Sequence, residues 1–444
     1  YDYKEHFAHV DYSYAMTTHK CLPKSGEVVT ENGIEEIQNV SVGDKVWTDE
    51  GRMKPILDVV ETGKKELYEI ETKTGVEIRC SPDHRIKTDS GWVKAENIGS
   101  DDKVALCRSQ ISSSESDDFG YLLGILVGDG CYSYDSNRVD ISMAKDSKLK
   151  NELKELLEKF SKGRLYENPK KSSNSLTIWT ENKEFRKTLL ERGLERSTAK
   201  EKVVPKLENE SEIVGFLQGL FDADGSASLK RRCIRLVSVS ESLIKQTKTL
   251  LHRVGIVSQI QARKNGSYAL TITGTSYDEY VKTVCFRHPK KRKRAEKKVN
   301  DRKVIGKTKN DYVPQGKEIR DILIDKVPTY EYGDTERYDW NGNDKVRHSL
   351  LESKRMTWYH LENIISYFEN RNIDIPNVVE NIYQDNHFFD SVESIKETGE
   401  YVDMIDIEVK DDHSFVYNGA IVHNSQGSTF TRTFVDVEDI NTCP

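Results

Sequence analysis

One short segment of this sequence occurs twice, and the repeat is the strongest constraint on what the chain can fold into. Residues 121–130 (YLLGILVGDG) align with residues 216–225 (FLQGLFDADG) at an offset of 95 residues. Strand-like runs follow both copies, at 139–142 and 234–237, and the start of an amphipathic helix follows each run. Two copies of one supersecondary unit predict an α/β domain with pseudo-two-fold symmetry.

Sequence typical of β-structure flanks the repeated region on both sides. Between residues 28 and 104, short runs of β-forming residues alternate with Gly-containing turns. Similar runs return at 389–409, and residues 415–422 predict a hairpin around Asn418-Gly419. A stretch rich in Ser, Asp and Glu at 112–118 resembles a linker. We therefore expect one all-β module that is interrupted in a loop by the α/β domain.

Length and composition narrow the class of protein. At 444 residues the chain is too long for one ordinary core, so we expect two or three domains. No apolar run approaches the roughly 20 residues needed to cross a bilayer, which argues against a membrane protein. The first residues lack a basic segment followed by an apolar stretch, so we predict a cytoplasmic protein. The 7 cysteines are scattered singly, which argues against a zinc clamp or a dense disulfide framework.

The charge distribution leaves room for a local nucleic-acid-binding surface. A net charge of −7 argues against a protein that is uniformly coated with DNA-binding charge. One basic run stands out at residues 290–294, extended by Lys297 and Lys298. Two interpretations of this run remain open: an arm that contacts DNA, or a solvated surface loop.

Three motifs in a fixed order suggest a chemistry for the ends of the β module. Cys21-Leu22 opens the first β-type stretch, Ser81-Pro82-Asp83-His84 follows within it, and Val422-His423-Asn424-Ser425 closes the last stretch. In this order the motifs resemble those of inteins, elements that excise themselves from a host protein and join its two flanks. The resemblance covers nearly the whole chain and implies an all-β, Hint-type horseshoe for the splicing domain. Ser81 stands where the family usually has Thr, a change that keeps the hydroxyl.

The resemblance assigns the first steps to residues near the start of the chain. A peptide bond is a poor electrophile, so its cleavage needs a positioned nucleophile and an acid for the leaving nitrogen. The Cys21 thiol would attack the carbonyl of Lys20, while His84 protonates the leaving amine and Ser81 hydrogen-bonds nearby. Asp406 matches a family position that tunes the cysteine and coordinates the steps.

The resemblance assigns the later steps to the last motif. The Ser425 hydroxyl would take the acyl group, and Asn424 would then cyclise by attacking its own backbone carbonyl. His423 and His413 would polarise that carbonyl. A final acyl shift would join Lys20 to Ser425, so the substrates are the chain's own flanks, and splicing needs no cofactor.

The two flanks support this interpretation independently. Joining residue 20 to residue 425 produces Thr17-Thr18-His19-Lys20-Ser425-Gln426-Gly427-Ser428-Thr429-Phe430. This joined sequence resembles a motif of superfamily 1 DNA helicases of the RecD-like type. We therefore expect both flanks to be fragments of an interrupted helicase.

The repeated segments resemble the motifs of LAGLIDADG homing endonucleases, and the second copy is the closer match. The family places the two motifs on helices along the pseudo-two-fold axis, where Gly124, Gly128 and Gly219 would permit close packing. Asp129 and Asp224 would then lie at the helix ends and hold Mg²⁺ for the cleavage of a phosphodiester. Lys202 resembles a family lysine near that site.

The endonuclease resemblance also implies a partner. It predicts a monomer that binds double-stranded DNA, at the site in a helicase gene that lacks the intein, and no membrane partner. The two sheets would carry basic residues into the major groove: Arg138, Lys145, Lys230, Arg231, Arg232, Arg235 and Arg263.

These inferences define the expected domain organisation. The predicted segments are 1–20 (upstream flank), 21–112 (splicing domain, first part), 117–286 (endonuclease), 287–385 (insert and possible DNA-recognition subdomain), 386–424 (splicing domain, second part) and 425–444 (downstream flank). Two alternatives remain open. One is a splicing-only element whose nuclease is a structural relic, and the other is a free-standing DNA-binding or nuclease protein whose terminal motifs are accidental.

Overall fold

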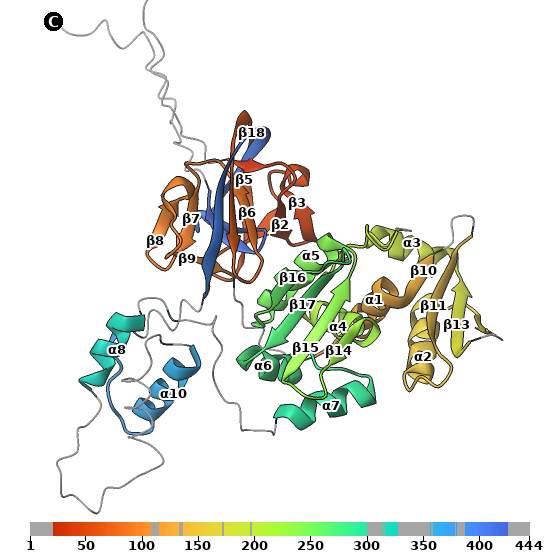
Figure 1. Cartoon of the computed structure of the whole chain (residues 1–444). Coiled ribbons are helices and arrows are strands. Elements are labelled where there is room, and N and C mark those ends of the chain that lie inside the picture. The colour runs from red at the N-terminus through yellow and green to blue at the C-terminus, as the bar shows by residue number, and fades with distance from the viewer. Residues whose placement is uncertain are drawn as a thin grey trace, which may run out of the picture.

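The computed structural model describes residues 21–107, 115–132, 136–170, 173–195, 198–299, 316–326, 358–377 and 387–424, and the single residues 313, 356 and 379. Figure 1 shows a β domain, an α/β unit and a pair of helices. The architecture is thus multidomain, as predicted. Within the described part, no helix has the length and apolar character required to span a bilayer.

The β domain is built from both ends of the described chain. Its strands from the first part are β1 (Leu22–Pro23), β2 (Glu27–Thr30), β3 (Gly33–Glu36), β4 (Lys45–Trp47), β5 (Met53–Thr72), β6 (Glu77–Cys80), β7 (Arg85–Thr88), β8 (Gly91–Lys94) and β9 (Lys103–Leu106). Two 3₁₀ turns, Ile37–Asn39 and Ala95–Asn97, lie between them. The last part adds β18 (Phe388–Val409), β19 (Ser414–Tyr417) and β20 (Ala420–His423).

The two ends are joined by strand pairing rather than by proximity in sequence. β18 pairs antiparallel with β5 from Val392↔Thr72 to Val409↔Ile56, and its first residues pair with β9. β20 pairs with β7 and β9, and β19 pairs with β2. All 12 strands therefore form one sheet system. Its core takes apolar residues from both parts of the chain, so neither part could bury its apolar face alone.

The α/β unit contains the same succession of elements twice. The first half has α1 (Asp118–Asp129), β10 (Gly130–Tyr132), β11 (Arg138–Ala144), α2 (Lys150–Ser161), β12 (Leu165–Pro169), β13 (Ser175–Glu181) and α3 (Lys183–Glu191). The second half has α4 (Glu210–Ala223), β14 (Gly225–Ala227), β15 (Cys233–Ser238), α5 (Glu241–Arg253), β16 (Gln259–Ala262), β17 (Tyr268–Thr273) and α6 (Thr275–Thr283). The strand orders β10-β11-β13-β12 and β14-β15-β17-β16 are equivalent.

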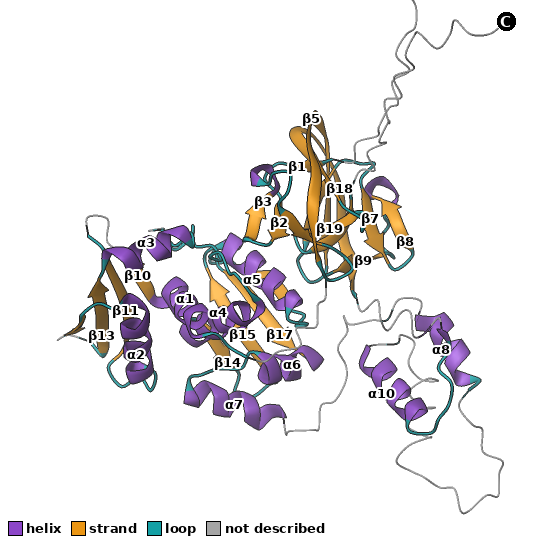
Figure 2. Ribbon diagram, turned by 180° about the vertical axis from the view of Figure 1, so that it is seen from behind, coloured by secondary structure: helices purple, strands orange, loops and turns teal. Residues whose placement is uncertain are grey.

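The repeated motifs form α1 and α4, which lie side by side between the two sheets (Figure 2). Glycines allow this contact, because a Cβ at Gly124 would lie 2.2 Å from Phe216 O and one at Gly219 would lie 2.1 Å from Tyr121 O. Real carbon atoms cannot approach so closely. The packing of these two helices therefore requires glycine on both faces.

Helix α7 (Pro289–Val299) corrects two expectations. The basic run at 290–294 forms a helix rather than a loop, because Ala295 is buried in the core of the α/β unit. That core therefore extends past the boundary predicted at residue 286. Further along the chain, α8 (Gly316–Ile324) and α10 (Trp358–Glu369) share a separate small apolar core.

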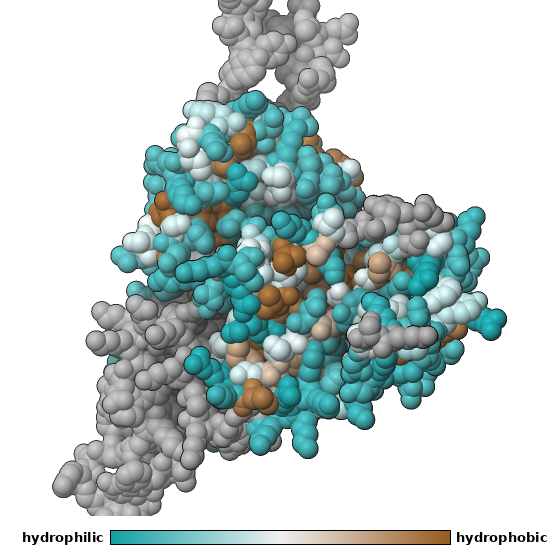
Figure 3. All heavy atoms as spheres, turned by 45° about the vertical axis from the view of Figure 1, so that its right-hand side comes forward, coloured by the Kyte–Doolittle hydropathy of each residue, from teal (hydrophilic) through white to brown (hydrophobic). Residues whose placement is uncertain are grey.

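Helix α5 joins the α/β unit to the β domain. Lys245 forms a 2.8 Å ion pair with Glu77, and the Arg253 guanidinium lies 4.7 Å from the centre of the Trp47 ring. Burial lowers the pKa of Arg253. On the face shown in Figure 3 the surface is mostly hydrophilic, and apolar residues form only small separate patches. The larger apolar side chains are thus mostly within the cores described above.

Candidate functional sites

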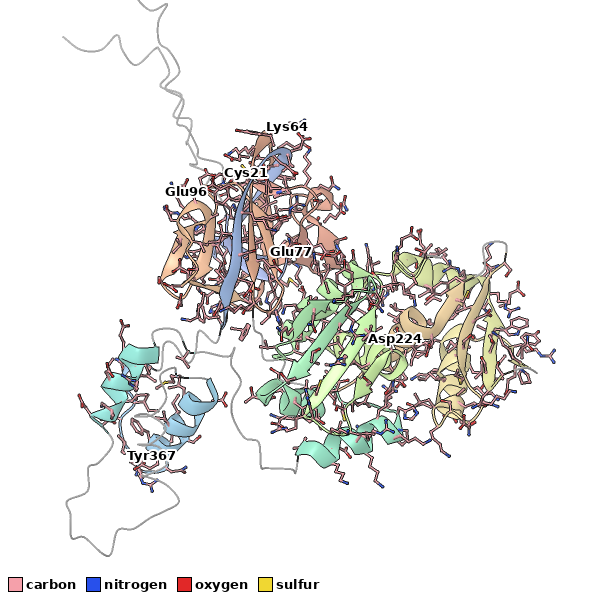
Figure 4. The ribbon with its side chains drawn as sticks, in the orientation of Figure 1. Cys21, Lys64, Glu77, Glu96, Asp224 and Tyr367 are labelled. Carbon is pink, nitrogen blue, oxygen red and sulfur yellow. The ribbon has the colours of Figure 1, made fainter. Side chains whose placement is uncertain are left out.

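Cys21 lies buried in the β domain (Figure 4), and its backbone N–H and carbonyl both form hydrogen bonds. Its amide N–H donates to Ser81 Oγ at 3.1 Å, and the Ser81 N–H donates to the Cys21 carbonyl at 2.9 Å. The Ser81 hydroxyl in turn donates to Asp83 Oδ1 at 2.6 Å. Each bond of Ser81 is thus directed, and the Cys21 nitrogen has a fixed orientation.

The turn that follows β6 places His84 beside this contact. The His84 N–H donates to the Ser81 carbonyl at 3.1 Å, and the Ala95 N–H donates to the His84 carbonyl at 2.8 Å. Ser81 and His84 are both completely buried. This short turn is anchored at both ends, and it carries both the Ser81 hydroxyl and the His84 imidazole.

The Cys21 thiol has a mixed electrostatic environment. Burial raises its pKa, hydrogen bonds from Thr62 and Lys65 lower it, and the Asp406 charge raises it again. Strand β1 brings Asp406 near, because Leu22 pairs with Ile405 in β18. Burial also raises the pKa of the neighbouring Cys80 thiol, so Cys80 is a poor nucleophile by comparison.

Strand β20 brings the last motif to the same edge. Val422 pairs antiparallel with Ile86, so the end of β20 lies beside the start of β7, which directly follows His84. The Asn424 side chain is completely buried, and its Nδ2 lies 3.4 Å from Val409 O. The Asn424 amide is therefore shielded from bulk water.

The imidazole of His423 lies against the carbonyl that cyclisation would cleave. Its Nδ1 is 2.5 Å from the Asn424 carbonyl oxygen, and the Trp92 ring packs edge-on at a centroid distance of 4.9 Å. His413 contacts Asn424 differently: its backbone carbonyl accepts the Asn424 N–H at 3.1 Å. Among the described residues, the buried His413 Nδ1 has no hydrogen-bond partner, so this ring atom does not bond to that carbonyl.

The structure thus brings seven predicted residues to one edge of the β domain: Cys21, Ser81, His84, Asp406, His413, His423 and Asn424. Ser425 and both flanks lie outside the described residues. Sequence reasoning did not assign roles to Thr62, Lys65 and Asp83, which contact the candidate nucleophile or Ser81. The position of Asp83 within the Ser81–His84 motif was the available signal for that residue.

A second candidate site lies where α1 and α4 end. Asp129 and Asp224 are both solvent-exposed at these ends. Partial desolvation and the neighbouring Asp224 charge raise the pKa of Asp129 to about 6, and partial desolvation also raises that of Asp224. Like charges held together at a helix C-terminus are unfavourable without a cation, because the helix dipole is also negative there.

Two lysines lie at the same helix ends. Lys202 Nζ donates to Gly128 O at 2.7 Å, and Lys291 Nζ donates to Asp222 O at 2.6 Å. Partial burial lowers the pKa of Lys291, and the nearby aspartates oppose that shift. Sequence reasoning predicted Lys202 at this site but missed Lys291, because it treated the basic run only as a whole.

Asp222, the acidic residue within the second motif, forms hydrogen bonds that hold the fold together. Its carboxylate accepts the Tyr121 hydroxyl at 3.0 Å and the N–H groups of Arg287 and His288 at 2.9 and 3.0 Å. These bonds hold the segment that leads into α7. Val127 fills the equivalent position of the first motif and is buried. The unusual first copy thus loses an anchor, not a carboxylate of the site.

The donor set fits divalent cations that share ligands with a substrate. Mg²⁺ commonly uses one or two carboxylates together with water and phosphate oxygens. Asp129 and Asp224 provide two exposed carboxylates whose mutual repulsion a cation would relieve. Within the described ranges, no cluster of three or more His, Cys, Asp or Glu side chains could hold a metal by itself.

Some of the predicted DNA-contacting side chains are exposed, and others contact side chains of the protein itself. Arg235 and Arg263 are exposed, whereas Arg138 lies 4.2 Å from the centre of the Trp179 ring, which itself stacks on Tyr166. Arg232 departs from the expectation, because it forms an ion pair with Asp278. Lys230 and Arg231 are exposed, and Lys145, also exposed, donates to Lys170 O at 2.7 Å.

Comparison with known proteins decides the family. The intein splicing domain family matches residues 26–424, which is most of the chain. This chain belongs to the intein family. The intein is 27% identical over 405 residues to the replicative DNA helicase DnaB of Synechocystis, covering 82% of this chain and 44% of that protein. It is 25% identical over 394 residues to the replication factor C small subunit of Methanocaldococcus jannaschii, covering 81% of this chain and 21% of that protein.

The intein therefore spans less than half the length of these curated relatives. Among solved structures, it is similar to variants of the homing endonuclease I-DmoI, with 20% identity and a TM-score of 0.32 over 40% of this chain and 97% of that chain. It is also similar to the gp41-1 intein, with 30% identity and a TM-score of 0.19 over 20% of this chain and 68% of that chain.

Proposed function

We propose that this intein excises itself between Lys20 and Ser425 and that Cys21 and Asn424 are the reacting residues. The pairing of Val422 with Ile86 brings the last motif close to the turn whose Ser81 holds Cys21, and this arrangement supports the proposal. Splicing must exchange two distant peptide bonds for one, so both ends have to share a pocket. We further propose that the paired β5 and β18 form the curved frame of a Hint-type horseshoe.

The first step breaks the bond to the upstream flank. The Cys21 sulfur attacks the Lys20 carbonyl, a C–S bond forms and the C–N bond to Cys21 breaks. Ser81 Oγ accepts the Cys21 N–H and so orients the nitrogen that leaves. His84, in the same turn, protonates this nitrogen, and the thiol loses its proton, so no external reagent is consumed.

The later steps release the intein. The Ser425 hydroxyl attacks the thioester, its oxygen bonds to the acyl carbon, and the Cys21 thiol is restored. Asn424 Nδ2 then attacks the Asn424 carbonyl and expels the Ser425 amine, leaving a cyclic imide. His423, 2.5 Å from the carbonyl oxygen, polarises it for this attack. The freed amine finally attacks the ester, which yields an amide between Lys20 and Ser425.

Mass spectrometry of the freshly expressed chain tests the splicing proposal. We expect released Cys21–Asn424 and a ligated peptide in which residue 20 precedes residue 425. The double variant Cys21→Ala with Asn424→Ala should remain whole. Cleavage at either junction of that variant would show that other residues perform the chemistry.

We also propose that the α/β unit is a LAGLIDADG-type endonuclease with pseudo-two-fold symmetry that cuts double-stranded DNA. The equivalent strand orders and the glycine contact between α1 and α4 support this proposal. Asp129 and Asp224 would hold Mg²⁺, which when bound activates water and stabilises the leaving oxygen. The exposure of both carboxylates leaves room for phosphate oxygens as further ligands.

The two lysines supply the rest of the site. Their ammonium groups lie at the helix ends beside the carboxylates, where they would attract and orient the phosphates. The exposed arginines of the second sheet would contact the DNA backbone and base edges. The helical pair α8 and α10 would serve as an additional DNA-recognition subdomain.

Incubation with DNA that carries the joined helicase sequence tests the nuclease proposal. We expect Mg²⁺-dependent double-strand cleavage, which Asp224→Asn should abolish. The absence of cleavage with every divalent metal tried would leave the alternative, a splicing element with a purely structural α/β unit.

A further inference from the structure

The segment that carries Lys202 runs from the proposed nuclease site to the β domain. Its first residue donates to Gly128 O at the end of α1, and its own carbonyl accepts the Ser240 hydroxyl at 2.5 Å. Four residues later, Lys206 lies against the β2–β3 hairpin. A Cβ atom added at Gly33 of this hairpin would lie 3.5 Å from the Lys206 Cα. The segment is therefore a strap between the two domains.

Gln246 of α5 holds the middle of this strap. Its Oε1 accepts the Val204 N–H at 2.7 Å, and its Nε2 donates to Glu27 Oε1 at 2.7 Å. The side chain is 6% exposed, so water cannot easily replace either partner. One amide thus joins the strap, two residues from Lys202, to strand β2 of the β domain.

The partners dictate the residue type at this position. Val204 offers a donor and Glu27 an acceptor, so the bridging group must accept on one side and donate on the other. An apolar side chain would leave both partners unpaired, and a carboxylate would be repelled by the Glu27 carboxylate.

The β-domain anchor is itself rigidly held. The Glu27 N–H donates to Asn418 Oδ1 at 2.8 Å, and the Asn418 N–H donates to the Glu27 carbonyl at 2.8 Å. These contacts use the Glu27 backbone, so the side chain is available to Gln246 without disturbing the β19–β20 hairpin. Changes at Gln246 should therefore leave the splicing edge intact.

We propose that Gln246 is a positioning residue for DNA cleavage that fixes Lys202 by tying its strap to Glu27. This inference rests on the proposed nuclease function of Asp129, Asp224 and Lys202. It makes the splicing domain part of the frame of the nuclease site, so that the two activities share a structural element. After the loss of Gln246 the strap would keep its Ser240 bond and the Lys206 contact with the β2–β3 hairpin, but it would lose the bridge from Val204 to Glu27.

The test measures DNA cleavage and splicing on the same full-length preparations. Gln246→Leu and Gln246→Glu should lower kcat roughly 10- to 100-fold with KM changed less than about threefold, because Lys202 is displaced rather than removed. Splicing yield should stay unchanged in both variants, which shows that the β domain has folded. Lys245→Met is the matched control: it breaks the neighbouring interdomain ion pair to Glu77 but leaves the strap untouched.

The exchange variant Glu27→Gln with Gln246→Glu separates positioning from general destabilisation. In it the new Gln side chain donates to the new carboxylate, which still accepts the Val204 N–H, so kcat should return to within about threefold of the unchanged protein. Equal cleavage by the unchanged protein and Gln246→Leu would overturn the inference alone, as would failure of the exchange to restore kcat. Loss of cleavage in Lys245→Met to the same extent would also overturn it. No cleavage by the unchanged protein would instead overturn the nuclease function and this inference with it.

Discussion

The backbone of Cys21 and the residue Ser81 hold each other through two hydrogen bonds, one in each direction. The Cys21 N–H donates to Ser81 Oγ at 3.1 Å, and the Ser81 N–H donates to the Cys21 carbonyl at 2.9 Å. The nitrogen that would leave in the proposed first step is therefore already oriented. Pre-organisation of this kind lowers the barrier without new contacts in the transition state.

Loss of the Ser81 hydroxyl should slow the first step. Ser81→Ala removes the acceptor of the Cys21 N–H, and we expect roughly 10- to 100-fold slower cleavage at the upstream junction. Ser81→Thr keeps the hydroxyl and should retain most of the rate. Thiol-induced cleavage kinetics in an Asn424→Ala background measure this step alone. Equal rates for Ser81→Ala and Ser81→Thr would contradict the orienting role.

Lys65 should control how the first step depends on pH. Its hydrogen bond and charge lower the pKa of the buried Cys21 thiol, and the thiolate is the nucleophile. Lys65→Met should therefore shift the rising limb of the rate profile to higher pH and lower the neutral rate severalfold. The exposed neighbour Lys64 is the matched control, and Lys64→Met should leave the profile in place (Figure 4).

The ionised Asp129 carboxylate should lower the folding stability of the α/β unit at pH values above its pKa. Its folded pKa of about 6 exceeds the ordinary value, so the folded state binds the extra proton and the stability penalty grows as pH rises from about 4 to 6. Because the side chain is exposed, screening reduces the effect, and Asp129→Asn should stabilise the α/β unit by about 1 kcal/mol at pH 8. Calorimetric unfolding should show this gain at pH 8 and none at pH 4. The same gain at both pH values would contradict the electrostatic cause.

The α1–α4 contact should not tolerate a methyl group. A Cβ at Gly219 would lie 2.1 Å from the Tyr121 carbonyl oxygen, so Gly219→Ala must separate the helices. We expect a loss of about 3 kcal/mol or more, together with loss of DNA cleavage. Gly99→Ala adds the same methyl group 3.8 Å from Asp102 Oδ2 and should be nearly neutral. Thermal unfolding of the two variants provides the comparison.

Local sequence patterns determined much of the architecture before any coordinates. The repeat placed two equivalent helices ahead of strands, and these are α1 and α4 with β11 and β15. Asn418-Gly419 predicted a hairpin that is present as β19 and β20, because both residues adopt the positive φ that the turn requires. Periodicity and turn chemistry are properties of adjacent residues, so a single sequence can reveal them.

Tertiary structure alone decided which distant side chains meet. Lys65 has no pattern that marks it, and the motifs that contain Asp83 and Lys291 do not show what those two side chains contact. Their contacts follow from the neighbours that the fold supplies. The packing of Ala295 in the core of the α/β unit was not predicted for the same reason, because its burial depends on a surface formed by remote elements. Sequence alone thus indicated the candidate reacting groups and the repeated scaffold. Folding decided their orientation and their partners, because long-range packing rather than local conformation sets distances between residues far apart in the chain.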